Sequence, residues 1–496
     1  MRTLRPALQL TLTLALASCT PPTEEKAAPG PLPWASTDNP AAGTVEELLA
    51  APYDAIPESE RRARQAFVDQ PLRVQGTVLG AEGQPVAAAS VTLGTQLTFT
   101  DELGRFELSS NRLNKLLRVE AAGHYTHIAA AHLSLPLQTQ EVSLGRIRLT
   151  AREQGLTRFL FGGDTSFGRR FLDPLERYTR AEMPEPHPDA LIDVRNPLPG
   201  SRAVLERMSE LFHSVDYPVV NLETVITRSP ATPHQEKAFV YFSLPESLPA
   251  LIDLGVQYVS LGNNHLYDYL ELGISDTLTA LEAAGLKHSG AGRDRNQAFA
   301  PHRQDIAGHP YSFLSMTSVS GERFATTYYA TDTKGGAADL RDGERVVAAI
   351  QQERALGRFP IVQLHAGLEY SYSPVPYVLG RFALVGEQRP TLIIGHHPHV
   401  AQGFAYHHGV LAVHSLGNFL FDQLRLDTML SMMVSVDLAG EVLRRTDVFP
   451  IYVEDSVPRL LAGPTAERFL RRIDESSRAH GAVVVPSGGR GEVRPQ

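Results

Sequence analysis

Cysteine is nearly absent from this sequence, and so is any surplus of basic residues. The 496 residues include a single cysteine, Cys19, so no disulfide forms within the chain. Because that cysteine stands so early, thiolate catalysis and cysteine-based zinc sites are excluded from the later domains. The formal net charge of -9 argues against a nucleic-acid partner. The hydrophobic content of 43% is typical of globular protein, and the length predicts more than one domain.

The first 19 residues predict an export signal rather than part of a fold. The segment MRTLRPALQLTLTLALASC has Arg2 and Arg5 ahead of a leucine-rich stretch. That stretch is shorter than the about 20 residues of a membrane-spanning helix. The small residues before Cys19 resemble a bacterial lipoprotein box, in which this cysteine is lipidated after cleavage; an ordinary signal peptide with an incidental cysteine is the alternative. Thr20 follows where an inner-membrane retention signal would have Asp. We therefore expect an exported protein, held to the cell envelope by a lipid anchor alone, and to the outer membrane if the cell has one.

Two segments of different composition follow this leader. Residues 20–70 are rich in Pro, Ala and Glu and predict a semi-extended tether. Residues 71–150 show short alternating strands between Gly, Asp and Glu turns, as in RVQGTVLGAEGQPVAAASVTLG and TFTDELGRFELSS. This pattern resembles the carboxypeptidase regulatory-like β-sandwich. We see no cluster of reactive side chains in it, which favours a small spacer or interaction module.

From residue 156 to about 455, apolar runs alternate with segments of helical periodicity. Helices are expected over 247–254, 274–284, 340–356 and 377–385. Strands that alternate with helices predict a layered α/β fold. Residues 456–496 are expected to form a helix followed by a flexible tail.

Each apolar run of this region ends in polar side chains that suit metal binding. Ligands bind at the carboxyl ends of strands in open α/β sheets, so we expect these groups to line one rim. Each also has a structural explanation, because an Asp after a strand often caps a helix and paired Asn residues often form a turn. Mixed oxygen and nitrogen ligands without cysteine suit one or two ions such as Mn, Fe or Zn. The groups are Asp164; Asn221 and Glu223; Asn263, Asn264 and His265; His365; His396, His397 and His399; and His414, Ser415 and Asn418.

The segment TLIIGHHPHVAQG, residues 391–403, concentrates imidazole at one strand end. His397 and His399 flank Pro398, whose fixed φ can aim both rings into one volume. Taken alone, the segment suits a metal site or a hydrogen-bonded turn equally.

Six motifs together resemble a known family. They are GGDTSFGR, VNLETVIT, SLGNNHLYDY, HAGLEYSYSP, IGHHPHVAQG and HSLGNFLFDQ, in that order. They are similar to those of the CapA family, the bacterial poly-γ-glutamate capsule synthesis proteins, whose domain is similar to the calcineurin-like metallophosphoesterases. The resemblance covers residues 156–455 and implies a layered metallophosphoesterase-like fold with a metal centre that hydrolyses phosphoesters.

By position, the resemblance also implies one ligand set for two ions. A carboxylate is needed between the ions, and two adjacent cations can clamp an in-line displacement at phosphorus. The implied set is Asp164 and His399 on the first ion, Glu223 between the ions, and Asn264, His365 and His397 on the second.

Five further residues receive roles around this set. His265 resembles the catalytic histidine that gives a proton to the leaving oxygen, and Asp268 would hold its tautomer. Arg169 either clamps an anionic substrate or is a solvated loop residue. Ser415 and Asn418 either line the substrate pocket or form a tight turn.

The sequence departs from the family pattern in its first motif. Where calcineurin-like enzymes carry Asp-x-His, Asp164 is followed by Thr165 and Ser166, which removes one ligand of the first ion. Ala366 also replaces a usual tryptophan. We therefore expect one of two functions. The first is a surface metallohydrolase that cleaves phosphoester bonds, or alternatively amide bonds, in capsule or envelope polymer metabolism, with an anionic polymer or a phosphoester as substrate. The second is a non-catalytic tethered factor that binds such a polymer or a membrane synthase or export complex. A nutrient-scavenging phosphatase is a third alternative.

Overall fold

The computed structural model describes residues 69–112, 115–131, 140–177 and 180–496, together with positions 59, 62, 65 and 66. The predicted leader with Cys19 and nearly all of the predicted tether lie outside these residues. Within the described part of the chain, we find no helix that is both long and apolar enough to cross a membrane.

The described residues between 72 and 148 form strands and turns in two small sheets. Strand β4 (Arg105–Ser110) alternates exposed and buried side chains, as a strand with one face on a core does. That core includes Val74, Val91, Phe106 and Val119. The regulatory-like resemblance of this segment stays a prediction. The sheet orders are β4-β1 (Leu72–Leu79)-β7 (Glu141–Arg148) and β3 (Gln96–Phe99)-β2 (Ser90–Leu93)-β5 (Lys115–Glu120)-β6 (His127–Ala131).

A sheet of ten strands, counted over the described residues, forms the centre of the remaining chain. Its strand β8 (Leu156–Thr165) is buried at every residue, because Phe159 and Phe161 face one core and Leu160 faces another. The order is β13 (Lys287–Ser289)-β12 (Tyr258–Ser260)-β9 (Tyr217–Leu222)-β8-β23 (Leu430–Ala439)-β24 (Val442–Glu454)-β27 (Arg490–Pro495)-β26 (Ala482–Ser487), with β22 (Asn418–Leu420) on β8 and β25 (Val457–Leu460) on β24.

A second sheet, of six strands in the described residues, packs against the first. Strands β16, β18, β19 and β21 run parallel, and both faces are covered, which accounts for continuous apolar runs such as Leu392–Ile394. The order is β15 (His302–Ile306)-β16 (His309–Thr317)-β18 (Phe359–His365)-β19 (Leu392–His396)-β21 (Val410–Val413)-β20 (Phe404–His407).

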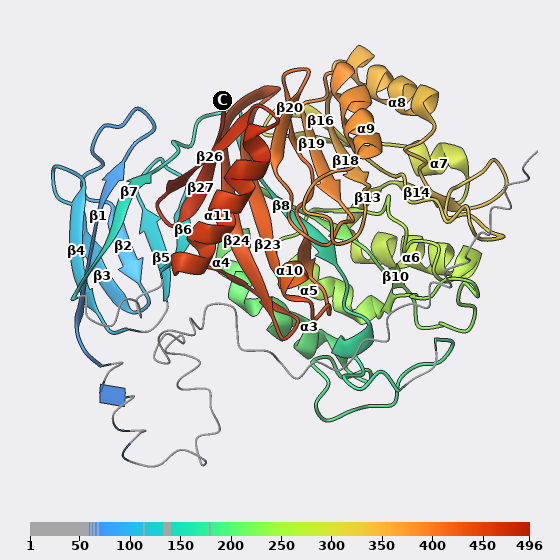
Figure 1. Ribbon diagram of the computed structural model, residues 1–496, viewed down its shortest axis with the longest axis horizontal. Helices are drawn as coiled ribbons and strands as arrows, with labels where there is room; N and C mark the ends of the chain where they lie inside the picture. The colour runs from blue at the N-terminus through green and yellow to red at the C-terminus, as the bar shows by residue number, and fades with distance from the viewer. Residues whose placement is uncertain are drawn as a thin grey trace, which may run out of the picture. The chain divides into compact units, whose positions relative to one another are not determined.

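Aromatic side chains fill the space between the two sheets. The ring of Phe159 lies 5.1 Å from that of Tyr311, and the ring of Tyr258 lies 4.8 Å from that of Phe313. Helices α8 (Gly343–Ala355) and α9 (Pro376–Glu387) pack on the outer face of the six-stranded sheet. Helices α3 (Pro197–Leu205), α4 (Ser209–His213), α5 (Leu248–Asp253) and α6 (Leu270–Ala284) pack on the ten-stranded sheet (Figure 1). The predicted mixed α/β architecture is confirmed, with layers in the order helix, sheet, sheet, helix.

The C-terminal segment differs from the prediction. Helix α11 (Gly463–Arg478) is present, but the residues after 480 are not a flexible tail. They form the hairpin of β26 and β27, in which Val484 and Val493 are buried and pair in register, and β27 pairs with β24. The remaining elements are α7 (Arg295–Phe299), α10 (Leu426–Met429), the pairs β10 (Val225–Ile226) with β11 (Phe242–Ser243) and β14 (Ala291–Gly292) with β17 (Gly336–Ala337), and the 3-10 turns η2 (Arg169–Phe171), η3 (Glu206–Met208) and η4 (Pro245–Ser247).

Candidate metal centre

The candidate centre lies where strands of both large sheets end. Asp164 stands at the end of β8, and Glu223 follows β9 directly, in the ten-stranded sheet. His365 ends β18 of the six-stranded sheet, and His397 follows β19. The groups expected at one rim do come together, but they come from the strand ends of two sheets. The two sheets pack face to face, so their strand ends converge at a shared edge.

A first group of ligand atoms comes from Asp164, Glu223 and His399, all buried. The atoms lie within 4.8 Å of one another. His399 Nδ1 is 3.1 Å from Asp164 Oδ2, and His399 Nε2 is 4.0 Å from Glu223 Oε1. Asn221 Nδ2 donates a hydrogen bond of 2.8 Å to Asp164 Oδ1, which holds this carboxylate in place.

A second group shares Glu223 and adds His365 and His397, again within 4.8 Å. His365 Nε2 lies 3.4 Å from Glu223 Oε1 and 3.1 Å from His397 Nδ1. Asn264 Oδ1 lies 2.6 Å from the same His365 nitrogen. The structure thus brings together all six residues of the expected ligand set, with Glu223 common to both groups. We call these six residues the cage.

The charges of the cage fit a cation. Both carboxylate oxygens of Glu223 are buried and lack a hydrogen-bond partner among the described residues. Burial, followed by the charge of Asp164, raises the pKa of Glu223 well above its usual value. Burial acts on Asp164 in the same direction, but its contact with His399 holds the pKa of Asp164 below the usual range. Two buried, ionised carboxylates repel each other and destabilise the folded state unless positive charge lies between them. This donor set therefore suits one or two divalent ions.

The imidazoles divide into two kinds. Burial lowers the pKa of His365 to about 3 and that of His397 well below its usual value, so both rings are neutral, the form that binds metals. Burial also acts to lower the pKa of His399, but Glu223 and Asp164 outweigh it and raise this pKa to about 10. Without a cation, His399 therefore carries the positive charge that the carboxylates require.

The backbone around the cage is strained. His397 has φ +99° and His399 has φ +58°, on either side of Pro398. Such left-handed values persist only where the surroundings enforce them, and they cluster at functional sites. On the opposite sheet, a Cβ at Gly163 would meet the Gly417 carbonyl oxygen at 1.8 Å, so glycine is needed beside Asp164.

His265 stands beside the cage with a supporting network. Its Nε2 lies 3.8 Å from Glu223 Oε1, and its Nδ1 lies 2.7 Å from Asp268 Oδ2. Lys237 Nζ lies 2.5 Å from Asp268 Oδ1 and donates a 2.8 Å hydrogen bond to the Asn264 carbonyl oxygen. The Tyr241 ring stacks on His265 at 3.8 Å. In this network Asp268 holds Nδ1 of the ring, and Nε2 faces the cage.

The pKa values of this network have one dominant cause. Burial raises the pKa of Asp268 to about 6 although Lys237 acts to lower it. Burial, followed by the charge of Lys237, lowers the pKa of His265 well below its usual value. Sequence reasoning missed Lys237 and Tyr241. They lie in the segment PHQEKAFVYF, which has no periodicity or motif that points to the cage.

The three expected substrate-binding residues differ in their contacts with the cage. Arg169 pairs with Glu176 at 2.9 Å and with Asp422 at 3.4 Å, and its Nη1 donates to the Tyr241 hydroxyl at 3.3 Å. Ser415 Oγ accepts the Gly417 N–H, as in the turn alternative. Asn418 Oδ1 lies 2.9 Å from His399 Nδ1 and so supports a cage residue directly.

The Ser166 hydroxyl contacts the backbone of its own turn. Its Oγ accepts the Gly168 N–H at 3.2 Å. His396, which we did not place among the expected ligands, is fully buried with its Nδ1 3.7 Å from Asp164 Oδ1. Its Nε2 lies 3.1 Å from Gln363 Oε1.

A buried cage of carboxylates, amides and histidines at the strand ends of a mixed α/β fold defines a candidate metalloprotein. The family model described as "Bacterial capsule synthesis protein PGA_cap" matches residues 158–423. The chain therefore belongs to this family.

Individual relatives agree with this assignment. The chain is 28% identical over 260 residues to "PGA biosynthesis protein CapA" of Bacillus subtilis (strain 168), which covers 52% of this chain and 67% of that protein. It is 26% identical to "Capsule biosynthesis protein CapA" of Bacillus anthracis, over 52% of this chain and 64% of that one. A "probable polyglutamine synthesis accessory protein" of Mycobacterium tuberculosis (strain ATCC 25618 / H37Rv) is 23% identical over 66% of this chain and 92% of its own. The matches to the two Bacillus proteins thus span about two thirds of their length.

Similarity to solved structures is limited. Catechol 1,2-dioxygenase from Acinetobacter sp. ADP1 matches 16% of this chain and 52% of its own at 13% identity, with a TM-score of 0.14. A likeness this small carries no argument about fold or function.

Proposed function

We propose that this protein is a metal-dependent, metallophosphoesterase-like hydrolase that acts in the biosynthesis of poly-γ-glutamate capsule or another envelope polymer. One observation carries the proposal. Glu223 presents two buried carboxylate oxygens that have no hydrogen-bond partner in the described part of the chain, at the point shared by two groups of ligand atoms. The helix–sheet–sheet–helix layering and the family membership support the same class.

The cage residues would hold one or two divalent ions, Mn, Fe or Zn. When bound, such ions neutralise the charge of a phosphoryl group and act as Lewis acids. His265 Nε2 would protonate the leaving oxygen, because Asp268 takes the Nδ1 side of the ring and keeps Nε2 toward the cage. Arg169 and Tyr241 would form the wall of the substrate site on the side of His265.

The place of action is part of the proposal. An export signal ending at Cys19 and the Pro/Ala-rich segment 20–70 would tether the folded residues to the envelope by a lipid anchor. The polymer or its phosphoester precursor would then be reached outside the cytoplasm, where a synthase or export complex is a fitting partner.

A second function, a non-catalytic assembly factor, is favoured by Ser166. Its hydroxyl accepts a backbone N–H where hydrolases of this kind have a ligand, so the first ion has one donor fewer. In that case the cage would bind the anionic polymer or a partner through a metal without turnover.

The deciding experiment combines metal analysis with a substrate panel. The protein is stripped with a chelator, reloaded with Mn, Fe or Zn, and assayed on a phosphodiester, a pyrophosphate and poly-γ-glutamate. Metal-dependent hydrolysis of any of these supports the enzyme. Full metal occupancy without turnover of any substrate favours the assembly factor.

A further inference from the structure

A groove lies between the strands of residues 72–148 and the C-terminal hairpin β26–β27. It encloses about 1100 Å³, and none of the cage residues lines it. Its walls all belong to one compact unit of the chain, Thr44–Gln496. The walls are in contact at their base, where His127 Nε2 lies 2.8 Å from the Gly488 carbonyl oxygen. A second hollow of about 640 Å³ adjoins it and shares Thr77, Arg105 and Arg146. The two hollows form one elongated groove.

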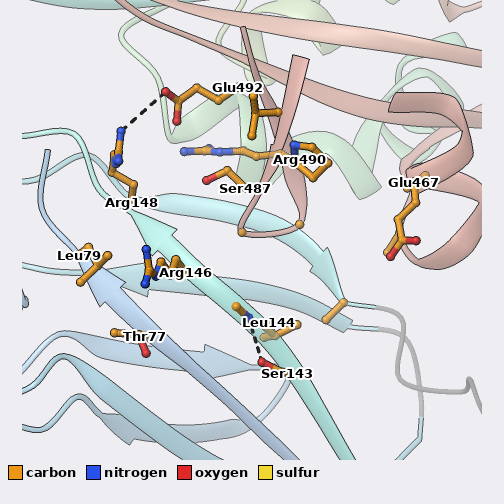
Figure 2. A pocket seen from close by; sticks show the side chains of 18 of the residues that line it. Thr77, Leu79, Ser143, Leu144, Arg146, Arg148, Glu467, Ser487, Arg490 and Glu492 are labelled. Atoms are coloured by element: carbon orange, nitrogen blue, oxygen red, sulfur yellow. Dashed lines mark hydrogen bonds and ion pairs between the residues drawn. The ribbon is translucent and has the colours of Figure 1, made fainter. Parts of the chain in front are cut away.

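Arginine is the most frequent charged residue in the lining of the larger hollow. Figure 2 shows Arg146 and Arg148 on the β7 side and Arg490 on the hairpin side. Five arginines face two glutamates, a local positive surplus in a chain whose formal net charge is -9. The five are Arg105, Arg146, Arg148, Arg490 and Arg494, and the two are Glu467 and Glu492.

The acidic groups near the groove are largely engaged already. Glu492 pairs with Arg494 at 2.7 Å. It also pairs with Arg148 at 3.8 Å (Figure 2). In the smaller hollow, Glu107 pairs with Arg73 at 3.1 Å, and Asp101 accepts backbone N–H groups of its own turn.

Two arginines remain for a ligand. Arg105 and Arg146 are exposed, and their side chains have no ion-pair partner among the described residues. A free guanidinium presents a planar fork of donors that matches a carboxylate.

The backbone beside the groove is also open. Strand β7 is an edge of its sheet, and β26 is an edge of the ten-stranded sheet. Both strands contribute to the groove lining. Edge strands offer unpaired N–H and C=O groups, and an extended chain of amides can pair with them. On β26 the Val484 N–H is already bound by Asp474 Oδ1 and Pro486 has no N–H, so the open backbone donors are those of β7. A concave passage between two edges suits an extended chain better than it suits a flat membrane surface.

We propose that this groove binds an extended, amide-linked polymer that carries repeated carboxylates, an assignment that rests on the proposed role in polymer biosynthesis. Carboxylates pair with Arg105 and Arg146, while the amide backbone lies along β7. The groove is a binding site separate from the cage.

The test measures binding of fluorescent poly-γ-glutamate of defined length to the full chain, by anisotropy at constant salt. The variant Arg105→Gln/Arg146→Gln is compared with Arg293→Gln/Arg444→Gln. The control pair removes the same charge at exposed arginines that line neither hollow. We expect about tenfold weaker binding for the groove pair and a change within about twofold for the control pair.

Three results overturn the inference: no binding by the unmodified chain, equal weakening by both pairs, or no weakening by the groove pair. Vesicles with phosphatidylglycerol form a parallel arm. Arginine-dependent binding to vesicles without binding to the polymer also overturns it. Metal content and phosphodiester hydrolysis are measured on every variant. If the polymer binds through the arginines but no phosphodiester is hydrolysed, the enzyme proposal is wrong and the groove proposal stands. If hydrolysis is present but the arginines do not affect polymer binding, only the groove proposal is wrong.

Discussion

Lys237 Nζ lies 2.5 Å from Asp268 Oδ1, and both side chains are buried. The other oxygen of that carboxylate lies 2.7 Å from His265 Nδ1. A lysine that no motif identifies therefore balances the charge of the carboxylate that holds His265. It links the loop of residues 233–241 to the cage.

Replacement of Lys237 by Met removes the cation that pairs with the buried Asp268 carboxylate. We expect a loss of about 3–5 kcal/mol in the free energy of unfolding at pH 8, the usual cost of removing one partner of a buried ion pair. The pKa of Asp268 is about 6 with Lys237 present, and it rises further without it, because Lys237 acts to lower it. The loss therefore shrinks as the pH falls toward 6 and is smallest below 6, where Asp268 is protonated with or without Lys237. Urea denaturation at pH 8 and pH 5 measures both values.

The double variant Lys237→Met/Asp268→Asn provides the control for this prediction. It removes both charges, so it should recover part of the loss at pH 8. Equal losses at pH 5 and pH 8 would mean that the lysine contributes packing rather than charge.

His265→Ala should abolish turnover without removing metal. His265 Nε2 faces Glu223 at 3.8 Å but belongs to neither ligand group. General acid catalysis contributes about 10²–10⁴-fold, so we expect a loss of that size in kcat with unchanged metal content. His213→Ala, at an exposed histidine, is the matched control. Loss of metal together with activity would place His265 among the ligands instead.

Glu223→Gln should empty both halves of the cage, whereas His397→Ala should affect one. Loss of a residue that only hydrogen-bonds to a metal ligand costs about 10–100-fold in metal affinity. Glu223 is itself a ligand candidate and is shared by both groups, so we expect at least about 100-fold weaker metal binding for Glu223→Gln. The control Glu441→Gln makes the same change at an exposed residue. Competition with a metal indicator measures the affinities, and wild-type affinity in Glu223→Gln would remove it from the cage.

Much of the centre follows from sequence because its residues stand directly after strong strand signals. The runs before Asp164, Glu223 and His365 are apolar and buried as expected. The period of a strand does not say which sheet it joins, so the division between two sheets could not be foreseen. Lys237 could not be foreseen either, because its place depends on a loop that packs against residues about 30 positions later.

Element ends show the same limit. The helix expected from residue 340 begins at Gly343, because the Asp342 side chain accepts the Arg345 N–H and caps it there. The segment after 480 carries Pro486, Gly488 and Gly489, which suggested a loose end. Those glycines instead form the turn of a hairpin whose valines pack beside Leu470.

Metal affinity should fall as the pH falls. Without a cation, the pKa of His399 is about 10, so this ring carries a proton at pH 8, and burial raises the pKa of Glu223. A divalent ion must displace the protons that these two groups carry, and binding should release about one or two protons. Calorimetry in two buffers of different ionisation enthalpy counts these protons at pH 8. A count near zero would mean that the ion binds away from His399 and Glu223.

The most direct measurement is anomalous diffraction at the Mn edge from crystals of the Mn-loaded protein. The account predicts strong density in contact with the Glu223 carboxylate, flanked by Asp164 and His399 on one side or by Asn264, His365 and His397 on the other, and on both sides if two ions bind. Density that leaves Glu223 without a metal contact, or a fully loaded crystal with the ion elsewhere, would contradict it.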